Sequence, residues 1–231
     1  MRAIPTSPER APVSVSQLFS YPFRIFFLSM TVLALAVIPL WVMQVNGVIS
    51  LPLAMPGLFW HQHEMLFGFL SGAIAGFLLT AVCVWTQTER THGFRLVLLW
   101  GVWLAGRVLL ATGADLPFWL VQGVNLAFLP LVMVDAGWRI RRARQLRQVM
   151  LLVILGLLWL MQVGFVTTLD TRFSHGALVM AMALIGVIGG RITPAFSANW
   201  LRQRGMDSSA VRVVPRLDMA SLASLIALMA A

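Results

Sequence analysis

The sequence predicts an all-α protein: a polytopic membrane helix bundle with six complete spans and an incomplete seventh. Three observations predict this class. Hydrophobic residues make up 59% of the chain and charged residues only 11%, and the mean hydropathy is +0.86. Long apolar runs recur along the chain, and arginines gather between alternate runs. A soluble domain has roughly 25% charged residues, so this chain has too little polar surface to cover a fold in water.

Each apolar run predicts one membrane-spanning helix. A span needs about 20 apolar residues, because backbone polar groups in lipid must be bonded within the helix. A seventh run begins near Leu217 and is still apolar at Ala231, so we expect an unfinished helix and a chain shortened relative to a longer protein. The six complete runs are Ile25–Val45, Met65–Gln87, Leu96–Ala114, Leu116–Val134, Gln148–Leu169 and Phe173–Gly190.

The first run could be mistaken for a secretory signal, because Arg2, Arg10 and Arg24 precede it. It is longer than the usual apolar region of a signal peptide, and no convincing small-residue cleavage site follows. We therefore expect a retained first span. Residues 1–24 are then a cytoplasmic segment, and residues 25–231 form a transmembrane helical domain.

Arginine placement tests the span map independently. All 17 basic residues are arginine. With the N-terminus inside, only Arg172 falls in an outer loop and only Arg107 within a span. Such a split follows the positive-inside rule and predicts a bacterial inner-membrane protein with a cytoplasmic N-terminus. The clusters are then anchors beside anionic lipid rather than a nucleic-acid site. The arginines assigned to the cytoplasmic side are Arg2, Arg10, Arg24, Arg90, Arg95, Arg139, Arg141, Arg142, Arg144, Arg147, Arg191, Arg202, Arg204, Arg212 and Arg216.

The densest polar cluster is Trp-His-Gln-His-Glu-Met at residues 60–65, where the chain enters the second span from the outer side. One interpretation is an interfacial helix start, with Trp60 in the aromatic belt and Glu64 at the positive end of the helix dipole. The other is metal or haem ligation. His61 and Met65 are four residues apart and share a helix face, whereas His61 and His63 point about 200° apart and cannot easily bind one ion together.

The same topology assigns each of the other polar residues to a span or to one side of the membrane. Arg107 is the one charge deep inside a span, and such a residue is a functional hypothesis by default. Its candidate partners are Glu64, Asp115 or a haem propionate, which a guanidinium grips in bidentate fashion. His175 opens the sixth span on the outer side. His92 falls in an inner loop, so it is excluded from a shared site.

Glycine and proline spacing adds two expectations. Gly68, Gly72 and Gly76 repeat every four residues on one face of the second span. Such a face admits a closely packed helix, or a flat macrocycle. Pro194 follows Gly190 and cannot continue the backbone hydrogen-bond ladder, so the sixth span is expected to end there.

Two segments together resemble the NnrS family. Trp-His-Gln-His-Glu-Met-Leu-Phe-Gly-Phe at residues 60–69, followed by Ala-Gly-Phe-Leu-Leu-Thr-Ala at residues 75–81, is similar to its first signature. Gly-Gly-Arg-Ile-Thr-Pro-Ala-Phe-Ser-Ala-Asn at residues 189–199 is similar to its second. The resemblance covers the whole chain, but only the N-terminal half or slightly more of the family's usual length. The matching residues are His61, His63 and Glu64 in the first signature and Arg191, Pro194 and Asn199 in the second.

The resemblance implies a haem- and copper-containing bacterial membrane protein of the nitric oxide and nitrosative stress response, which accompanies denitrification. Neutral imidazole suits haem iron and copper, and a thioether favours reduced copper. The implied site lies near the periplasmic face and binds or relays nitric oxide or its iron complexes, with Arg107 holding a propionate or pairing with Glu64. The implied haem or metal ligands are His61, His63, His175 and Met65.

Two other functions stay open, and so does catalysis. The chain could be a membrane transporter for a metal or small complex, or a non-catalytic membrane scaffold. A transporter should place polar residues along a path through the bilayer midplane, whereas the strongly polar residues here are skewed to the two surfaces. No residue type decides whether a substrate is turned over or whether the protein forms a homo-oligomer.

Overall fold

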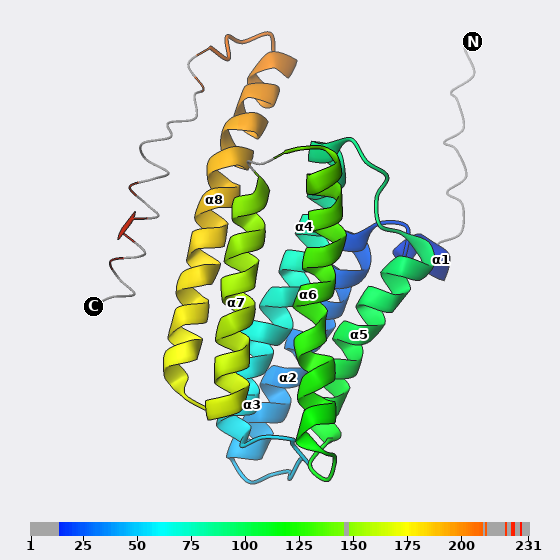
Figure 1. Ribbon diagram of the computed structural model, residues 1–231, viewed down its shortest axis with the longest axis vertical. Coiled ribbons are helices and arrows are strands. Elements are labelled where there is room, and N and C mark those ends of the chain that lie inside the picture. The colour runs from blue at the N-terminus through cyan, green and yellow to red at the C-terminus, as the bar shows by residue number, and fades with distance from the viewer. Residues whose placement is uncertain are drawn as a thin grey trace, which may run out of the picture.

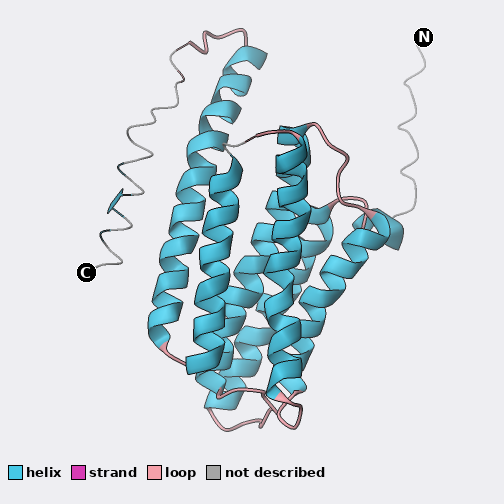
Figure 2. Ribbon diagram, in the orientation of Figure 1, coloured by secondary structure: helices cyan, strands magenta, loops and turns pink. Residues whose placement is uncertain are grey.

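The computed structural model describes residues 14–145 and 148–209, together with the isolated positions 211, 220, 223, 224 and 227. Over this part of the chain the structure is helical and contains no strand (Figure 2). Six helices are long and apolar enough to cross a membrane. The predicted fold class is therefore confirmed. The incomplete seventh span predicted from Leu217 falls almost wholly outside the described residues.

The helices follow one another with short connections. α3, η1 and α4 form one continuous rod, in which η1 is a π-helix, so the six candidate spans are α2, the rod, α5, α6, α7 and α8. The bounds are α1 Val15–Leu18, α2 Pro22–Val45, α3 Gly57–His63, η1 Glu64–Phe69, α4 Leu70–Thr86, α5 Gly93–Thr112, α6 Phe118–Arg142, α7 Val149–Thr168 and α8 Thr171–Gln203.

The spans run up and down, so the bundle has two distinct ends (Figure 1). The end at the bottom of the view, here called the α3 end, holds the start of α3, the α5–α6 turn and the α7–α8 turn. The opposite end, here called the arginine end, holds α1 and the loop between α4 and α5. The described arginines that belong to it are Arg24, Arg90, Arg95, Arg139, Arg141, Arg142, Arg144, Arg202 and Arg204.

The second span begins earlier than predicted. Hydropathy placed its start at Met65, but the helix starts at Gly57 and runs to Thr86. Pro56 stands immediately before the first helical residue, where a missing N–H costs nothing. The polar run at residues 60–65 is therefore inside the rod, not ahead of it. Trp60 is 1% exposed, so the interpretation that places it in an interfacial aromatic belt is wrong.

The sixth span does not end at Pro194. α8 continues through this proline to Gln203. A proline removes one backbone donor, and its ring crowds the carbonyl four residues earlier, which here belongs to Gly190. Prolines are tolerated inside other spans of this chain as well, at Pro39 in α2 and Pro130 in α6. Membrane helices accept such breaks because neighbouring helices, Ser and Thr side chains and local changes in helix geometry satisfy the freed backbone groups.

The glycine repeat brings helices together. A Cβ on Gly72 would lie 3.3 Å from the Trp103 ring of α5, and one on Gly76 would lie 3.0 Å from Phe26 and Phe27 of α2. The face is thus filled by the side chains of two neighbouring helices. The prediction of close helix packing is confirmed, and these side chains leave no room there for a flat macrocycle.

Candidate functional site

The candidate site is built on the π-helix η1, at the α3 end of the second span. The N–H of Leu70 donates to the carbonyl of Met65, five residues back instead of four. Single π-turns inside α-helices occur frequently at functional sites, and they offset the backbone ladder. Two carbonyls of this turn are reached from α5: the Trp103 indole N–H donates to Gly68 at 3.0 Å, and Arg107 donates to Phe67 at 3.4 Å.

Arg107 and Glu64 form a buried ion pair. The guanidinium Nε lies 3.0 Å from Oε2 of the carboxylate, and the two side chains are 7% and 1% exposed. A second nitrogen of Arg107 donates to the amide oxygen of Asn125 on α6. Among the partners considered for Arg107, the structure thus has Glu64. Because the amide oxygen of Asn125 also accepts a hydrogen bond from Arg107, the guanidinium is already bound by two protein side chains.

His63 extends this network to α7. Its ring is fully buried, and its Nε2 lies 3.2 Å from the amide nitrogen of Gln162. An amide nitrogen only donates, so His63 Nε2 accepts, and the neutral ring then carries its proton on Nδ1. Nδ1 faces Oε1 of Glu64 at 3.7 Å, which is too long for a hydrogen bond. The Phe67 and Phe165 rings pack around the imidazole.

His61 lies on another side of the same helix. Its ring stacks on Trp41 of α2, with centroids 4.0 Å apart and planes at 14°. The imidazole is partly buried, and its buried Nδ1 has no hydrogen-bond partner among the described residues. Met65 is also partly buried and packs against the core. The stacking fixes the His61 ring while leaving a nitrogen unused.

His175 belongs to the same end of the bundle but not to the same cluster. It is exposed on the first turns of α8. Its neighbour Ser174 faces inward and donates to Gln62 of α3 at 3.2 Å. The contact between Ser174 and Gln62 therefore joins α8 to residues 60–65, here called the histidine segment. The His175 ring points away from it.

The second family signature lies apart from this cluster. Arg191, Pro194 and Asn199 all belong to α8, and Asn199 is exposed. On a regular helix Asn199 is about 36 Å along the axis from His175. The described part of the chain therefore does not join the two signatures in one site.

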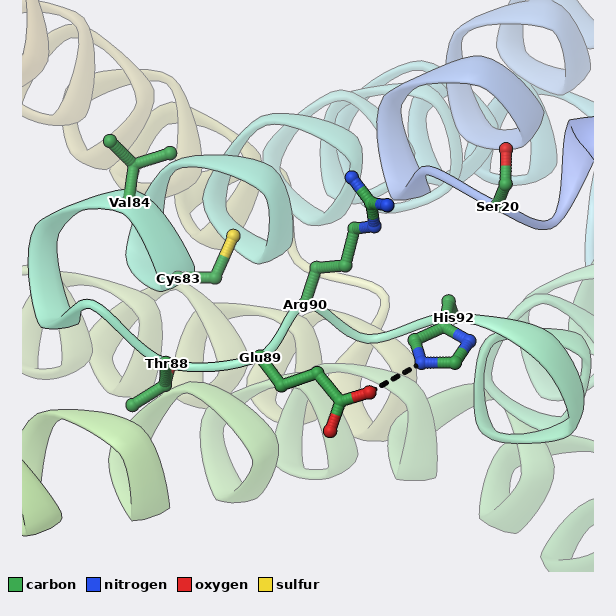
Figure 3. Close-up of a pocket in the computed structure, with 7 residues that line it drawn as sticks. All are labelled: Ser20, Cys83, Val84, Thr88, Glu89, Arg90 and His92. Carbon is green, nitrogen blue, oxygen red and sulfur yellow. Dashed lines mark hydrogen bonds and ion pairs between the residues drawn. The ribbon is translucent and has the colours of Figure 1, made fainter.

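His92 lies at the arginine end, as predicted, in the loop shown in Figure 3. Its Nε2 is 2.8 Å from Oε1 of Glu89, and the two side chains are 50% and 83% exposed. This hydrogen bond with His92 lowers the pKa of the Glu89 carboxyl below its ordinary value. Cys83 borders the same pocket of about 410 Å³. This free cysteine is partly buried.

Two members of the network were missed in the sequence. Asn125 and Gln162 are each 2% exposed, on α6 and α7. Both are amides inside otherwise apolar spans, and polar residues in that position are rare and usually bonded to other helices. The position of these two amides in apolar runs could therefore have identified them from the sequence. The prediction that strongly polar residues are skewed to the two surfaces considered charged residues and overlooked these amides.

A metal or haem fits this arrangement only in part. The described residues contain no group of three or more His, Cys, Asp or Glu side chains that could hold a metal ion. His63 has its Nε2 occupied by Gln162 and, with that amide placement, a proton on Nδ1. His61 offers a free nitrogen on a ring that Trp41 holds in place. Of these two histidines, His61 is therefore the one with a nitrogen free to ligate a metal or haem.

The fold and the site together define the class of protein. This is a multi-pass α-helical membrane protein with a buried ionic and amide network at one end of its bundle. The family model described as "NnrS protein" matches residues 17–231, and the chain belongs to the NnrS family. No curated protein and no solved structure matches the chain. Family membership and the helix bundle together fit a membrane protein of the nitric oxide response.

Proposed function

We propose that this protein is a haem- and copper-binding inner-membrane protein of the nitric oxide response, with its site at the α3 end. That end would face the periplasm, and nitric oxide or its iron complexes would be bound or relayed there. Membership of the NnrS family supports the biological setting. The location is supported by the histidine segment, which this fold builds into a membrane span rather than leaving in a loop.

One observation carries the proposal: the buried chain of contacts from Gln162 through His63, Glu64 and Arg107 to Asn125. It ties α7, the rod, α5 and α6 together at the helical segment that also carries His61. Burying charge inside a membrane span is costly, and such residues are usually retained for function. A purely structural bundle would be served as well by apolar side chains.

Each residue then has a role that its contacts support. His61 is the proposed ligand, because its ring is fixed by Trp41 and keeps a free nitrogen. His63, Glu64 and Arg107 are positioning residues that hold the histidine segment. The bound iron or copper would supply the centre that coordinates nitric oxide. Met65 and His175 remain candidates for further ligands, from a partly buried and an exposed position respectively.

The test is an optical spectrum and metal analysis of the full chain purified in detergent. Wild type is expected to carry haem, seen as a Soret band, and copper. His61→Ala should lose one of these, and added imidazole should restore it by filling the vacated space. His92→Ala, at the other end of the bundle, should retain both. A full chain that holds neither haem nor copper would overturn the proposal.

The orientation has its own experiment. The arginine end is proposed to face the cytoplasm, because Lys and Arg flank the cytoplasmic ends of spans. A reporter that is active only in the periplasm should be silent when fused after Gln145. The same reporter fused after Ala114, at the α3 end, should be active. The reverse result would place the histidine segment on the cytoplasmic side.

A further inference from the structure

α5 and α6 separate toward the arginine end and enclose a groove between them. The two helices meet at the α3 end and diverge upward in Figure 1. The cavity between them measures about 1040 Å³. Its deep part is apolar, lined by Leu98 and Val102 from α5 and by Leu131 from α6. Two arginines, Arg95 and Arg142, line it at the arginine end.

The other charges at this groove already have partners. Asp135 pairs with Arg139, Nε to Oδ2 at 3.1 Å, and also accepts from the hydroxyl of Thr91 at 2.8 Å. Glu89 is bonded to His92. Each of the two carboxylates therefore has a partner within the protein.

Arg95 and Arg142 are left over. Both side chains are exposed, and within the described residues neither makes a hydrogen bond or an ion pair. Arg90 also lines the groove, and its guanidinium lies over the Tyr21 ring, 4.0 Å from the centroid. Four guanidinium groups thus line a groove that has two carboxylates, so the groove has an excess of positive charge. Two unpaired arginines on facing helices present donors suited to a phosphate, which guanidinium groups bind in bidentate fashion.

We propose that this groove binds one anionic phospholipid, with its headgroup at the arginine end, where Arg95 and Arg142 line the groove, and an acyl chain lying along the apolar part. From Arg142 to Leu131 the groove extends about 16 Å along α6. An apolar floor alone would be covered by any lipid, because every outer face of a bundle is apolar. The two unpartnered arginines at its mouth make the site selective for negative charge, as do basic pockets between helices at the cytoplasmic surface.

A free phosphate is a poorer occupant, because it would leave the apolar floor uncovered. A second copy of the chain is also disfavoured, because the same groove on each copy would bring Arg95 and Arg142 against like charges. The proposal concerns the arginine end and is independent of the metal chemistry at the α3 end.

The experiment is native mass spectrometry of the delipidated full chain in detergent, titrated with phosphatidylglycerol or phosphatidylcholine. Wild type should retain one phosphatidylglycerol and little phosphatidylcholine. Arg95→Gln with Arg142→Gln should weaken phosphatidylglycerol binding by about fivefold for each arginine. The matched control is Arg141→Gln with Arg144→Gln, which removes the same charge from exposed arginines outside the groove and should leave binding unchanged.

A second pair of variants tests the apolar floor. Leu98→Trp fills the groove and should reduce phosphatidylglycerol retention, whereas Val153→Trp on exposed α7 surface should not. Arg95→Lys with Arg142→Lys keeps the charge and should retain most binding, which separates charge loss from misfolding. Equal retention of both lipids, equal binding by the two Gln pairs, displacement by excess inorganic phosphate, or a lipid-free dimer would each overturn the proposal.

Discussion

The Nε atom of Arg107 lies 3.0 Å from Oε2 of Glu64, and neither side chain is more than 7% exposed. This contact joins the second half of α5 to the π-helix of the second span, where the chain departs from regular α geometry. Burying one ion without the other is strongly unfavourable, so each residue explains the presence of its partner.

Removing one member of this pair should destabilise the bundle. Glu64→Gln or Arg107→Gln leaves an uncompensated buried charge and should lower the free energy of unfolding by about 3–5 kcal/mol. The double variant should recover part of that loss, because no lone charge remains. Denaturant unfolding in detergent measures all three. If both single variants were as stable as wild type, the ion pair would not be buried away from water.

Gly68 should tolerate alanine less well than a glycine with open space beside it. A Cβ on Gly68 would lie 2.6 Å from Oε2 of Glu64 and 3.0 Å from the Arg107 guanidinium, so Gly68→Ala should cost about 1–3 kcal/mol. Gly101→Ala is the control, since nothing lies within 4 Å of the added carbon and alanine favours a helix by about 1 kcal/mol. Thermal unfolding of both variants checks this. A Gly68→Ala protein at least as stable as Gly101→Ala would contradict the packing.

Thr91 should contribute to stability at the arginine end. Its hydroxyl donates to Asp135 at 2.8 Å and accepts from Arg139 at 2.8 Å, and the residue is 1% exposed. Thr91→Val keeps the shape and removes both bonds, so it should cost about 1–3 kcal/mol. Thr112→Val is the matched substitution, because that hydroxyl is exposed and bonds only to its own helix at Val108. Equal unfolding midpoints for the two variants would rule out the proposed contribution.

The loop between α4 and α5 should show a pH signature. The hydrogen bond from His92 lowers the pKa of Glu89, so the folded chain favours the ionised carboxyl. The stabilisation from a lowered pKa is present above the unfolded pKa and is lost as pH falls through the folded pKa. In a carboxyl-carbon NMR titration, Glu89 should therefore titrate at lower pH than an ordinary glutamate.

His92→Asn tests the cause of that shift. The Glu89 midpoint should rise toward its ordinary value when the hydrogen bond with His92 is lost. Asp207 serves as an internal control, because its pKa is lowered by hydrogen bonds from Ser209 and not by this histidine. A Glu89 midpoint that stays low in His92→Asn would assign the shift to another group.

Apolar run length and arginine placement were enough to predict the bundle, because lipid requires every span to be a long helix. These two patterns did not locate the start of the second span or the end of the sixth. Hydropathy could not place Gly57 at the start of the second span, since the polar run that follows it is stabilised by partners on α5 and α7. The end predicted at Pro194 failed because a proline stops a helix less reliably in a membrane than in water.

The candidate site was predicted in part. His61, His63, Glu64 and Arg107 do belong to one end of the bundle, and Glu64 was among the expected partners of Arg107. The orientation of His175 could not be predicted, because one residue of rotation on α8 decides whether Ser174 or His175 faces inward. The linking amides carry no charge and form no motif, so their role depends on contacts across helices.

The π-turn also means that no single helical wheel describes the second span. One residue of α-helix rotates a side chain by about 100° about the axis. Shortening Glu64–Phe69 by one residue would let this stretch become regular α-helix and would turn α3 by about that angle against α4. His63 would then leave Gln162, and a neighbouring side chain would take its direction. The one-residue excess in this turn therefore determines which of the two histidines is enclosed by the bundle and which stacks on α2.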